Sequence, residues 1–136
     1  MTDSAATVAD LLATKTNKQI TATDESATLA EAAGILARNR IGLLLVIDKN
    51  KAFRGLLSER DVVKALAQRG AEAAMTKVGE VATHTIRACD STRTLQSVLE
   101  SMETGHFRHM PVVEGGQIRG ILSITDILKF MKGNGM

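Results

Sequence analysis

Apolar side chains recur at a helical spacing in two separate stretches of this chain. Residues 29–36 follow the i, i+3, i+4, i+7 pattern of a helix with one buried face, and residues 95–102 repeat it. Thr28-Leu29-Ala30-Glu31 is a capping box, which predicts that the first helix begins there. We expect both helices to bury matching positions, which are Leu29, Ala32, Ala33 and Leu36 in the first and Leu95, Val98, Leu99 and Met102 in the second.

Continuous apolar runs predict the strands. The run Leu43–Ile47 indicates a buried strand, and Met110–Val113 repeats it more weakly. A turn and a second strand follow each run, and a short strand precedes each capped helix. These additional strands are predicted at Phe53–Leu57 and Gln19–Thr21 in the first half and at Ile118–Leu122 and Thr85–Arg87 in the second.

Further helices complete each half. Leader helices are predicted at Val8–Ala13 and Val78–Ala82, and closing helices begin near Glu59 and Ile124. Each half then has the order β-α-β-β-α. A unit of about 60 residues buries too little surface to be more than marginally stable alone, so we expect the two halves to share one core. The predicted fold class is α+β, with two tandem repeats packed sheet to sheet as one pseudo-twofold module.

The two halves are also similar in sequence. Gly55–Lys64 aligns with Gly120–Lys129 at an offset of 120 − 55 = 65, and Asp24–Leu29 aligns with Asp90–Leu95 at 90 − 24 = 66. The one-residue slip falls in a turn, where insertions are tolerated. The predicted repeats, each with its leader helix, are residues 1–71 and 72–136.

Composition narrows the classes of function. The net charge of +2 is too small to indicate nucleic acid or an anionic membrane as a partner, and the chain has three Phe but no Trp or Tyr for base stacking. It contains no window of about 18 apolar residues, and its first ten residues lack the features of a signal peptide. The single cysteine, Cys89, fits a reducing compartment. We therefore expect a cytoplasmic protein with no nucleic-acid or membrane partner.

The most informative motif is Gly-h-h-Ser-x-x-Asp, where h is apolar, at Gly55–Asp61 and Gly120–Asp126. Two interpretations remain open. Ser-x-x-Asp is a helix-capping signature, and a duplication would preserve caps. A strand that leads into a helix N-terminus also presents free amides and the positive end of the helix dipole to a phosphate, while the carboxylate can bind both hydroxyls of a ribose. A sugar and a phosphate together indicate a nucleotide.

Other polar residues form no comparable pattern. His84, His106, His109 and Cys89 lack the helical or C-x-x-C spacing of a metal site, so no metal is expected. We find no arrangement suited to catalysis, so we do not expect an enzyme. The closing helices carry more apolar side chains than one buried face needs, and we expect the surplus to serve packing between modules. These side chains are Val62, Val63, Leu66, Ile127, Leu128, Phe130 and Met131.

The chain resembles the CBS (cystathionine beta-synthase) domain family in three features. These are the element order, the string His106–Val113, and the helix starts Ser-Glu-Arg-Asp and Ser-Ile-Thr-Asp. The resemblance covers Val8–Met131, and the chain is similar to bacterial proteins made of a single CBS pair, or Bateman module. It implies a regulatory sensor that binds an adenine nucleotide in clefts between its two repeats. AMP is the leading candidate, with ATP, ADP, NAD and S-adenosylmethionine as alternatives. The family commonly pairs two modules, which implies a homodimer that acts on a regulated protein.

Carried over by position, the resemblance implies roles for individual residues. Asp61 and Asp126 would hold the ribose, and Arg60 is the first choice for a phosphate ligand. Thr125 stands where Arg60 stands in the first repeat, so the two sites should differ in charge, and equal occupancy is not expected. The other implied ligand-binding residues are Ser58, Ser123 and Thr125 at ribose or phosphate; Arg40, Arg108 and His106 as weaker phosphate ligands; and Ile20, Thr21, Gly42, Leu43, Thr85, Ile86, His109, Met110 and Pro111 around the adenine.

Two functions from different classes remain open. In the first, a nucleotide that bridges the repeats stabilises one relative orientation, which a partner protein then recognises. In the second, the chain is a ligand-free dimerisation or scaffold module whose motifs are only helix caps. Ultraviolet absorption separates the two, because a chain without Trp or Tyr absorbs little and any nucleotide that survives purification would dominate the spectrum.

Overall fold

The computed structural model describes residues 5–14, 20–84 and 87–133. The chain forms two compact units of mixed α+β structure. We call Ile20–Ile86 the first-repeat unit, and Met1–Gln19 together with Arg87–Met136 the second-repeat unit. None of the helices in these described ranges combines the length and apolar character needed to cross a bilayer.

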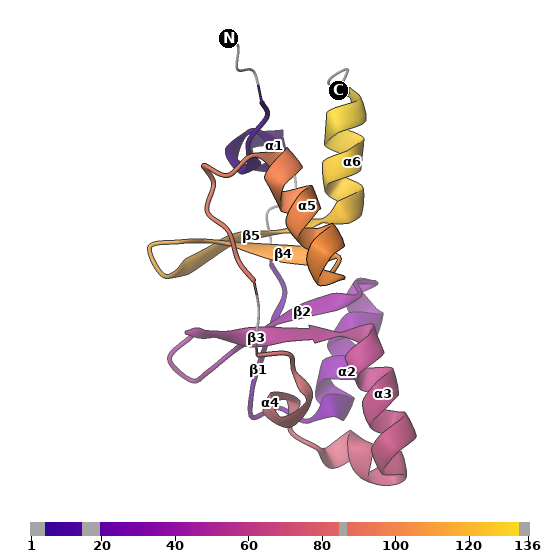
Figure 1. Cartoon of the computed structure of the whole chain (residues 1–136). Helices are drawn as coiled ribbons and strands as arrows, with labels where there is room; N and C mark the ends of the chain where they lie inside the picture. The colour runs from indigo at the N-terminus through magenta and orange to yellow at the C-terminus, as the bar shows by residue number, and fades with distance from the viewer. Residues whose placement is uncertain (1–4, 15–19, 85–86, 134–136) are drawn as a thin grey trace. The chain divides into compact units, whose positions relative to one another are not determined.

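The first-repeat unit is built on a three-stranded sheet in the order β1-β2-β3. Strand β1 runs parallel to β2, and β2 pairs antiparallel with β3. The helices lie on one face of this sheet (Figure 1). In chain order the elements are β1 (Ala22–Asp24), α2 (Leu29–Asn39), β2 (Leu43–Ile47), β3 (Phe53–Ser58), α3 (Glu59–Arg69), the 3₁₀ helix η1 (Gly70–Met75) and α4 (Val78–Val81).

The core of this unit lies between the sheet and its helices. Leu44 and Val46 of β2 and Leu57 of β3 are fully buried. They belong to a hydrophobic cluster that also contains Ala65 of α3 and Val78 of α4. The short helix α4 is therefore part of the core of the first-repeat unit.

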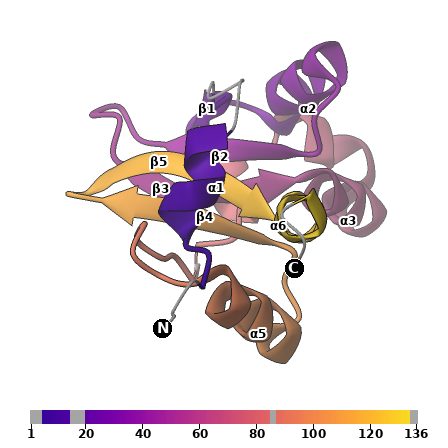
Figure 2. The ribbon, with the colours of Figure 1, turned by 90° about the horizontal axis from the view of Figure 1, so that it is seen from above.

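The second-repeat unit is an antiparallel hairpin of β4 and β5 with helices on one face. Seen from above, α1 lies over this hairpin, with α5 and α6 to its sides (Figure 2). Cys89 adds a single parallel bridge to Val112, in the place that β1 takes in the first-repeat unit. The elements are α1 (Val8–Thr14), α5 (Leu95–Gly105), β4 (His109–Glu114), β5 (Gln117–Ser123) and α6 (Ile124–Gly133).

The leader helix of each sequence repeat packs in the unit built from the other repeat. In the second-repeat unit, the amide of Val8 donates to the carbonyl of Arg93 at 2.8 Å. In the first-repeat unit, the amide of Val78 donates to the carbonyl of Ala27, also at 2.8 Å. The predicted boundaries, residues 1–71 and 72–136, divide the chain by its sequence repeat, whereas the compact units divide it by packing.

The local patterns predict these elements well. The capping box at α2 is confirmed, because the Glu31 amide donates to Thr28 Oγ1 at 3.2 Å and the Thr28 amide donates to Glu31 Oε1 at 2.9 Å. The predicted strand Leu43–Ile47 is β2, and the closing helices begin at Glu59 and Ile124. Of the positions predicted to be buried on the two capped helices, Ala33 and Leu99 are half-buried and the others are buried.

Three predictions need correction or cannot be followed. The first short strand begins at Ala22 rather than at Ile20 or Thr21, because pairing with β2 starts opposite Leu45, and Gln19 lies outside the described residues. Thr85 and Ile86, at the second short strand, lie outside the described residues. Ile127, which we had counted as surplus on the closing helix, is fully buried in the core of the second-repeat unit.

Candidate functional site

Both Gly-h-h-Ser-x-x-Asp motifs fold into the same turn from a strand into a helix. At the start of α3, the Ser58 amide donates to Asp61 Oδ2 at 2.9 Å, and the Asp61 amide donates to Ser58 Oγ at 3.1 Å. At the start of α6, the Ser123 amide donates to Asp126 Oδ2 at 3.3 Å, and the Asp126 amide donates to Ser123 Oγ at 3.0 Å. The capping interpretation of the motif is therefore realised in both units.

Capping does not use up these carboxylates. An ionised carboxylate offers about four acceptor positions on two oxygens, and the cap bond from the Ser58 amide occupies one position on one oxygen, Oδ2, of Asp61. Asp61 and Asp126 are both half-buried. The reciprocal cap bonds fix the orientation of each carboxylate, and a carboxylate fixed in this way can still accept hydrogen bonds from a diol.

The glycine of the motif serves packing. A Cβ atom on Gly55 would lie 2.5 Å from the carbonyl oxygen of Thr83, and one on Gly120 would lie 2.9 Å from Leu12 Cδ2. Because neither glycine has a side chain, the segment that contains a leader helix can pack close to the strand, at Thr83 against β3 and at Leu12 against β5. This role was not predictable from the motif, because a Gly at that position indicates only a bend or the end of a strand.

A second loop reaches each helix start. The Glu59 amide donates to the carbonyl of Gly42 at 3.0 Å, and the Ile124 amide donates to the carbonyl of Arg108, also at 3.0 Å. The loops before β2 and β4 are thus held against the motif in their own unit. Arg40 and His106 end the preceding helices in the left-handed conformation, with φ of 53° and 57°.

These bonds leave fewer helix amides for a ligand than the sequence led us to expect. At α3 the amides of Glu59 and Asp61 are already bonded within the chain, and at α6 the same is true of Ile124 and Asp126. The expectation of free amides at these helix starts is wrong for two of the first three in each helix. A phosphate here would therefore depend more on cationic side chains.

The two helix starts differ in charge. In the first-repeat unit, Glu59 lies beside Gly42, where a Cβ would be 3.6 Å from Glu59 Oε1. In the second-repeat unit, Ile124 takes the place of Glu59 and Arg108 that of Gly42, in line with the bonds just described. Glu59 was absent from the predicted site, although aligning the repeats residue by residue could have shown this difference.

Cationic groups gather around the loop before β4, whose Arg108 carbonyl accepts a hydrogen bond from the start of α6. Partial desolvation, and then the nearby charge of Arg108, lower the pKa of His109, while Asp126 acts in the opposite direction. The guanidinium of Arg87 lies 5.9 Å from the centre of the Phe107 ring, in the same loop. Arg87 is not among the predicted site residues, although it directly follows Thr85 and Ile86, which are.

The remaining predicted residues differ in accessibility. Met110 and Pro111 are buried, and Met110 belongs to the core, so it can offer a ligand only its backbone. Thr85 and Ile86 lie outside the described residues. The exposed residues of the set are Arg40, Gly42, Arg60, His106, Arg108, His109 and Thr125, and the half-buried ones are Ile20, Thr21, Leu43, Ser58, Asp61, Ser123 and Asp126.

Within each unit the structure brings together the start of the closing helix, α3 or α6, and the loop before β2 or β4. Leu43 pairs with Ser58 across β2 and β3, and His109 pairs with Ser123 across β4 and β5.

Asp61 also lines a pocket of about 150 Å³ together with residues of α3 and α4. This volume is smaller than the roughly 300 Å³ at which ligand pockets begin. In the described part of the chain, no three His, Cys, Asp or Glu side chains are grouped to hold a metal ion.

Comparison with known proteins gives one consistent family. The family model for the CBS domain matches residues 4–68 and again residues 78–133. The crystal structure of the CBS-domain containing protein ATU1752 from Agrobacterium tumefaciens is 35% identical, with a TM-score of 0.85, and the match covers 95% of this chain and 96% of that one. The CBS domain pair of protein MJ0100, crystallised with 5′-methylthioadenosine and S-adenosyl-L-methionine, is 24% identical with a TM-score of 0.81, covering 96% of this chain and 98% of that one.

Curated relatives are longer than the matched region. A 17.7 kDa protein of Acidianus ambivalens is 31% identical over 103 residues, which is 75% of this chain and 61% of that protein. The match covers only 19% of a CBS domain-containing protein of Arabidopsis thaliana. Two family matches, the repeated strand-to-helix motif and the shared fold lead to one conclusion: this chain belongs to the CBS-domain family, as a tandem pair of CBS repeats.

Proposed function

We propose that this CBS pair is a regulatory module that binds an adenine nucleotide and is not an enzyme. The observation that carries the proposal is the pair of carboxylates, Asp61 and Asp126, held in the same orientation at equivalent helix starts. The capping box uses the acid but needs no cationic group beside it, and in the second-repeat unit Arg108 lies at the helix start that carries Asp126. A ribose bound beside a phosphate uses both features.

The proposed contacts follow the position of each group. Asp61 and Asp126 accept hydrogen bonds from the ribose hydroxyls, and Ser58, Ser123 and Thr125 contact ribose or phosphate. Arg60 is the first phosphate ligand in the first-repeat unit, with Arg40, His106 and Arg108 as further cationic groups. The adenine is framed by backbone around Ile20, Thr21, Thr85, Ile86, Gly42, Leu43, His109, Met110 and Pro111.

The ligand is proposed to be AMP, with ATP, ADP, NAD and S-adenosylmethionine as the alternatives to test. The CBS pair of MJ0100, which has the same fold, was crystallised with two adenosyl compounds. That supports an adenosine ligand as a class. The charge difference between the helix starts supports unequal affinity, because Glu59 adds a negative charge at the start of α3 and Arg108 adds a positive charge beside the start of α6.

The same proposal includes a cytoplasmic homodimer that signals to a partner protein. Val63 and Leu66 of α3 and Leu128 of α6 are exposed by 64%, 52% and 53%, and large exposed apolar side chains mark interaction surfaces. Ligand binding would then shift the population of orientations between the repeats, which the partner recognises. Light scattering at micromolar concentration should give a dimer, and a monomer of 14.5 kDa would contradict this part.

A titration tests the function itself. Isothermal titration calorimetry of the purified chain against AMP, ATP, ADP, NAD and S-adenosylmethionine should show saturable binding of at least one of them. If none binds at millimolar concentration, the chain is better described as a ligand-free dimerisation or scaffold module. The ultraviolet spectrum of the freshly purified chain gives an independent check, because protein without Trp or Tyr contributes little absorption.

A further inference from the structure

Both ring nitrogens of His84 face backbone carbonyl oxygens. Nδ1 lies 2.9 Å from the carbonyl oxygen of Arg54, and Nε2 lies 2.7 Å from that of Gly79. A carbonyl oxygen only accepts hydrogen bonds, and a neutral imidazole carries a single N–H. Both bonds can therefore form only when His84 is the imidazolium ion.

The two carbonyls belong to different parts of the first-repeat unit. Arg54 is in β3, and Gly79 is in α4, the leader helix that this unit takes from the second sequence repeat. Next to His84, Thr83 pairs with Leu56 of β3 through backbone bonds of 3.0 and 2.8 Å. His84 therefore fastens the end of the leader segment to the edge of the sheet.

The surroundings favour the charged ring. The hydrogen bonds to Gly79 and Arg54 raise the pKa of His84 above its ordinary value of 6.5, and the charge of Glu25 adds to this. The guanidinium of Arg54 acts in the opposite direction, but its Nε lies 3.4 Å from Glu25 Oε1 in an ion pair.

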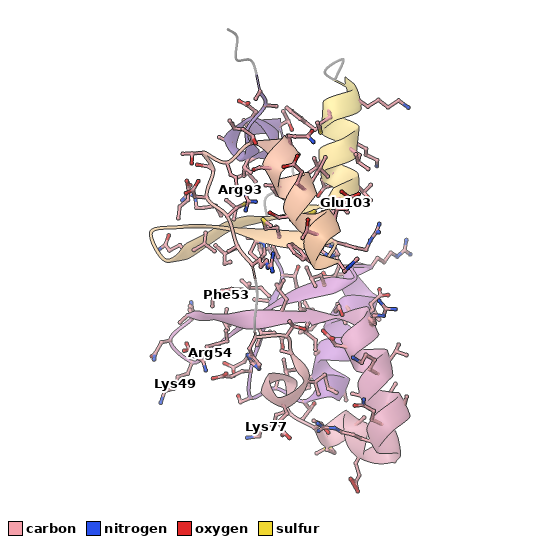
Figure 3. All side chains as sticks on the ribbon, viewed as in Figure 1. Lys49, Phe53, Arg54, Lys77, Arg93 and Glu103 are labelled. Carbon is pink, nitrogen blue, oxygen red and sulfur yellow. The ribbon has the colours of Figure 1, made fainter. Side chains whose placement is uncertain are left out.

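Lys77 and Glu80 are further charged groups near the ring. Both line, with His84, an open pocket of about 750 Å³; Figure 3 labels Phe53, Arg54 and Lys77 on its wall. The His84 side chain is exposed. Water can therefore exchange its proton freely.

We propose that His84 is a proton-dependent clip, which ties α4 to β3 as the imidazolium ion and loosens when it loses its proton as the pH rises. The device goes beyond the proposed ligand binding and does not depend on it. A neutral ring can keep one of the two bonds, and the other carbonyl is then left facing a nitrogen lone pair. The leader segment should then open more often, while the rest of the sheet stays paired.

The sign of the effect follows from linkage. Because the pKa of His84 is raised in the folded protein, its contribution to stability is complete below the unfolded value, about 6.5. The contribution is lost as the pH rises through the folded pKa. Opening of the leader segment should therefore increase from mildly acidic to mildly alkaline pH.

The second-repeat unit supplies an internal control. Val78 matches Val8 at 78 − 8 = 70, and the same offset places Thr14 where His84 stands. The Thr14 hydroxyl donates to the carbonyl of Leu11 at 2.7 Å, within its own helix. Thr14 does not titrate in this range, so the leader helix α1 should show no such response to pH.

Nuclear magnetic resonance tests the clip on the full chain. The ¹⁵N-resolved titration of His84 should have its midpoint above 6.5, with protons on both nitrogens at pH 6. Between pH 6 and pH 8, protection of the Ala82 and Thr83 amides, corrected for intrinsic exchange, should fall about two- to tenfold, the range expected for one net hydrogen bond. Protection of α1 amides should remain constant.

Two variants make the result decisive. His84→Gln keeps one donor but cannot titrate, so it should abolish the pH dependence at Ala82 and Thr83. His106→Gln removes a histidine from the end of α5 and should leave that dependence intact. A His84 midpoint at or below 6.5, or an unchanged pH profile in His84→Gln, would overturn the proposal.

Discussion

The first-repeat and second-repeat units build the same helix start in different electrostatic surroundings. Ser58 with Asp61, and Ser123 with Asp126, form the same reciprocal cap. Around that cap, one unit has Glu59 beside Gly42, and the other has Ile124 beside Arg108. The backbone geometry of a duplicated motif is constrained by its hydrogen bonds, whereas the side chains at its rim are free to diverge. Two half-sites of one shape can therefore differ in their preferred ligand.

The units also hold their leader segments differently. In the first-repeat unit the segment approaches β3 through backbone, at Thr83, and through both nitrogens of His84. In the second-repeat unit the contact at Gly120 is the end of the Leu12 side chain. Backbone cannot move aside as a side chain can, so the first attachment should be less tolerant of change.

The largest expected difference between the units comes from these two glycines. Gly55→Ala would place Cβ 2.5 Å from a backbone oxygen and should lower the free energy of unfolding by about 1–3 kcal/mol, the cost of overpacking. Gly120→Ala meets only Leu12 Cδ2, at 2.9 Å, and should cost less than about 1 kcal/mol. Urea unfolding of both variants measures the difference, and equal losses would contradict the claim that the attachments differ.

The caps should be equivalent in the two units. Ser58→Ala and Ser123→Ala each remove the hydroxyl that accepts from the amide of the following Asp, at 3.1 and 3.0 Å. Each should lower the free energy of unfolding by about 0.5–2 kcal/mol. Thermal unfolding of the two variants in parallel measures this, and a large loss from only one of them would show that the motifs are not structurally equivalent.

The smallest expected effect is the response of His109 to pH, opposite in sign to that of His84. The pKa of His109 is lowered in the folded protein, so the unfolded chain binds the proton first as the pH falls. Its contribution to stability should therefore decrease below pH about 6.5. Urea midpoints at pH 7.5 and 5.5 in a His84→Gln background should show this decrease, and adding His109→Gln should remove it. An unchanged decrease in the double variant would assign it to another group.

Sequence patterns predicted the elements because those depend on neighbours in the chain. The spacing of Leu29 and Leu36, and the capping box at Thr28, are local signals, and the structure confirms the helix that they predict. The packing of α1 and α4 was not predicted, because the choice of unit depends on contacts between distant segments. Periodicity at Val8 or Val78 shows which face is buried but not the partner that buries it.

For the candidate site too, the sequence predicted the local motif but not the contacts made by distant segments. The motif identified Asp61 and Asp126, and both lie at helix starts as expected. The use of the helix amides by the carbonyls of Gly42 and Arg108 could not be read from the sequence, because it depends on how a loop folds back. The charge of Glu59 could have been noticed, but its place beside Gly42 needed the structure.

The central claim is that the two carboxylates bind a nucleotide as well as cap a helix, and calorimetric titration of Asp61→Asn and Asp126→Asn tests it most directly. Asn can still accept the cap bond, so the melting temperature should change little. Loss of a charge-assisted hydrogen bond, worth about 1.5–3 kcal/mol, should weaken binding about ten- to a hundredfold. The account predicts this weakening with AMP, or with whichever adenosine ligand binds the wild-type chain. Unchanged affinity in both variants would contradict it.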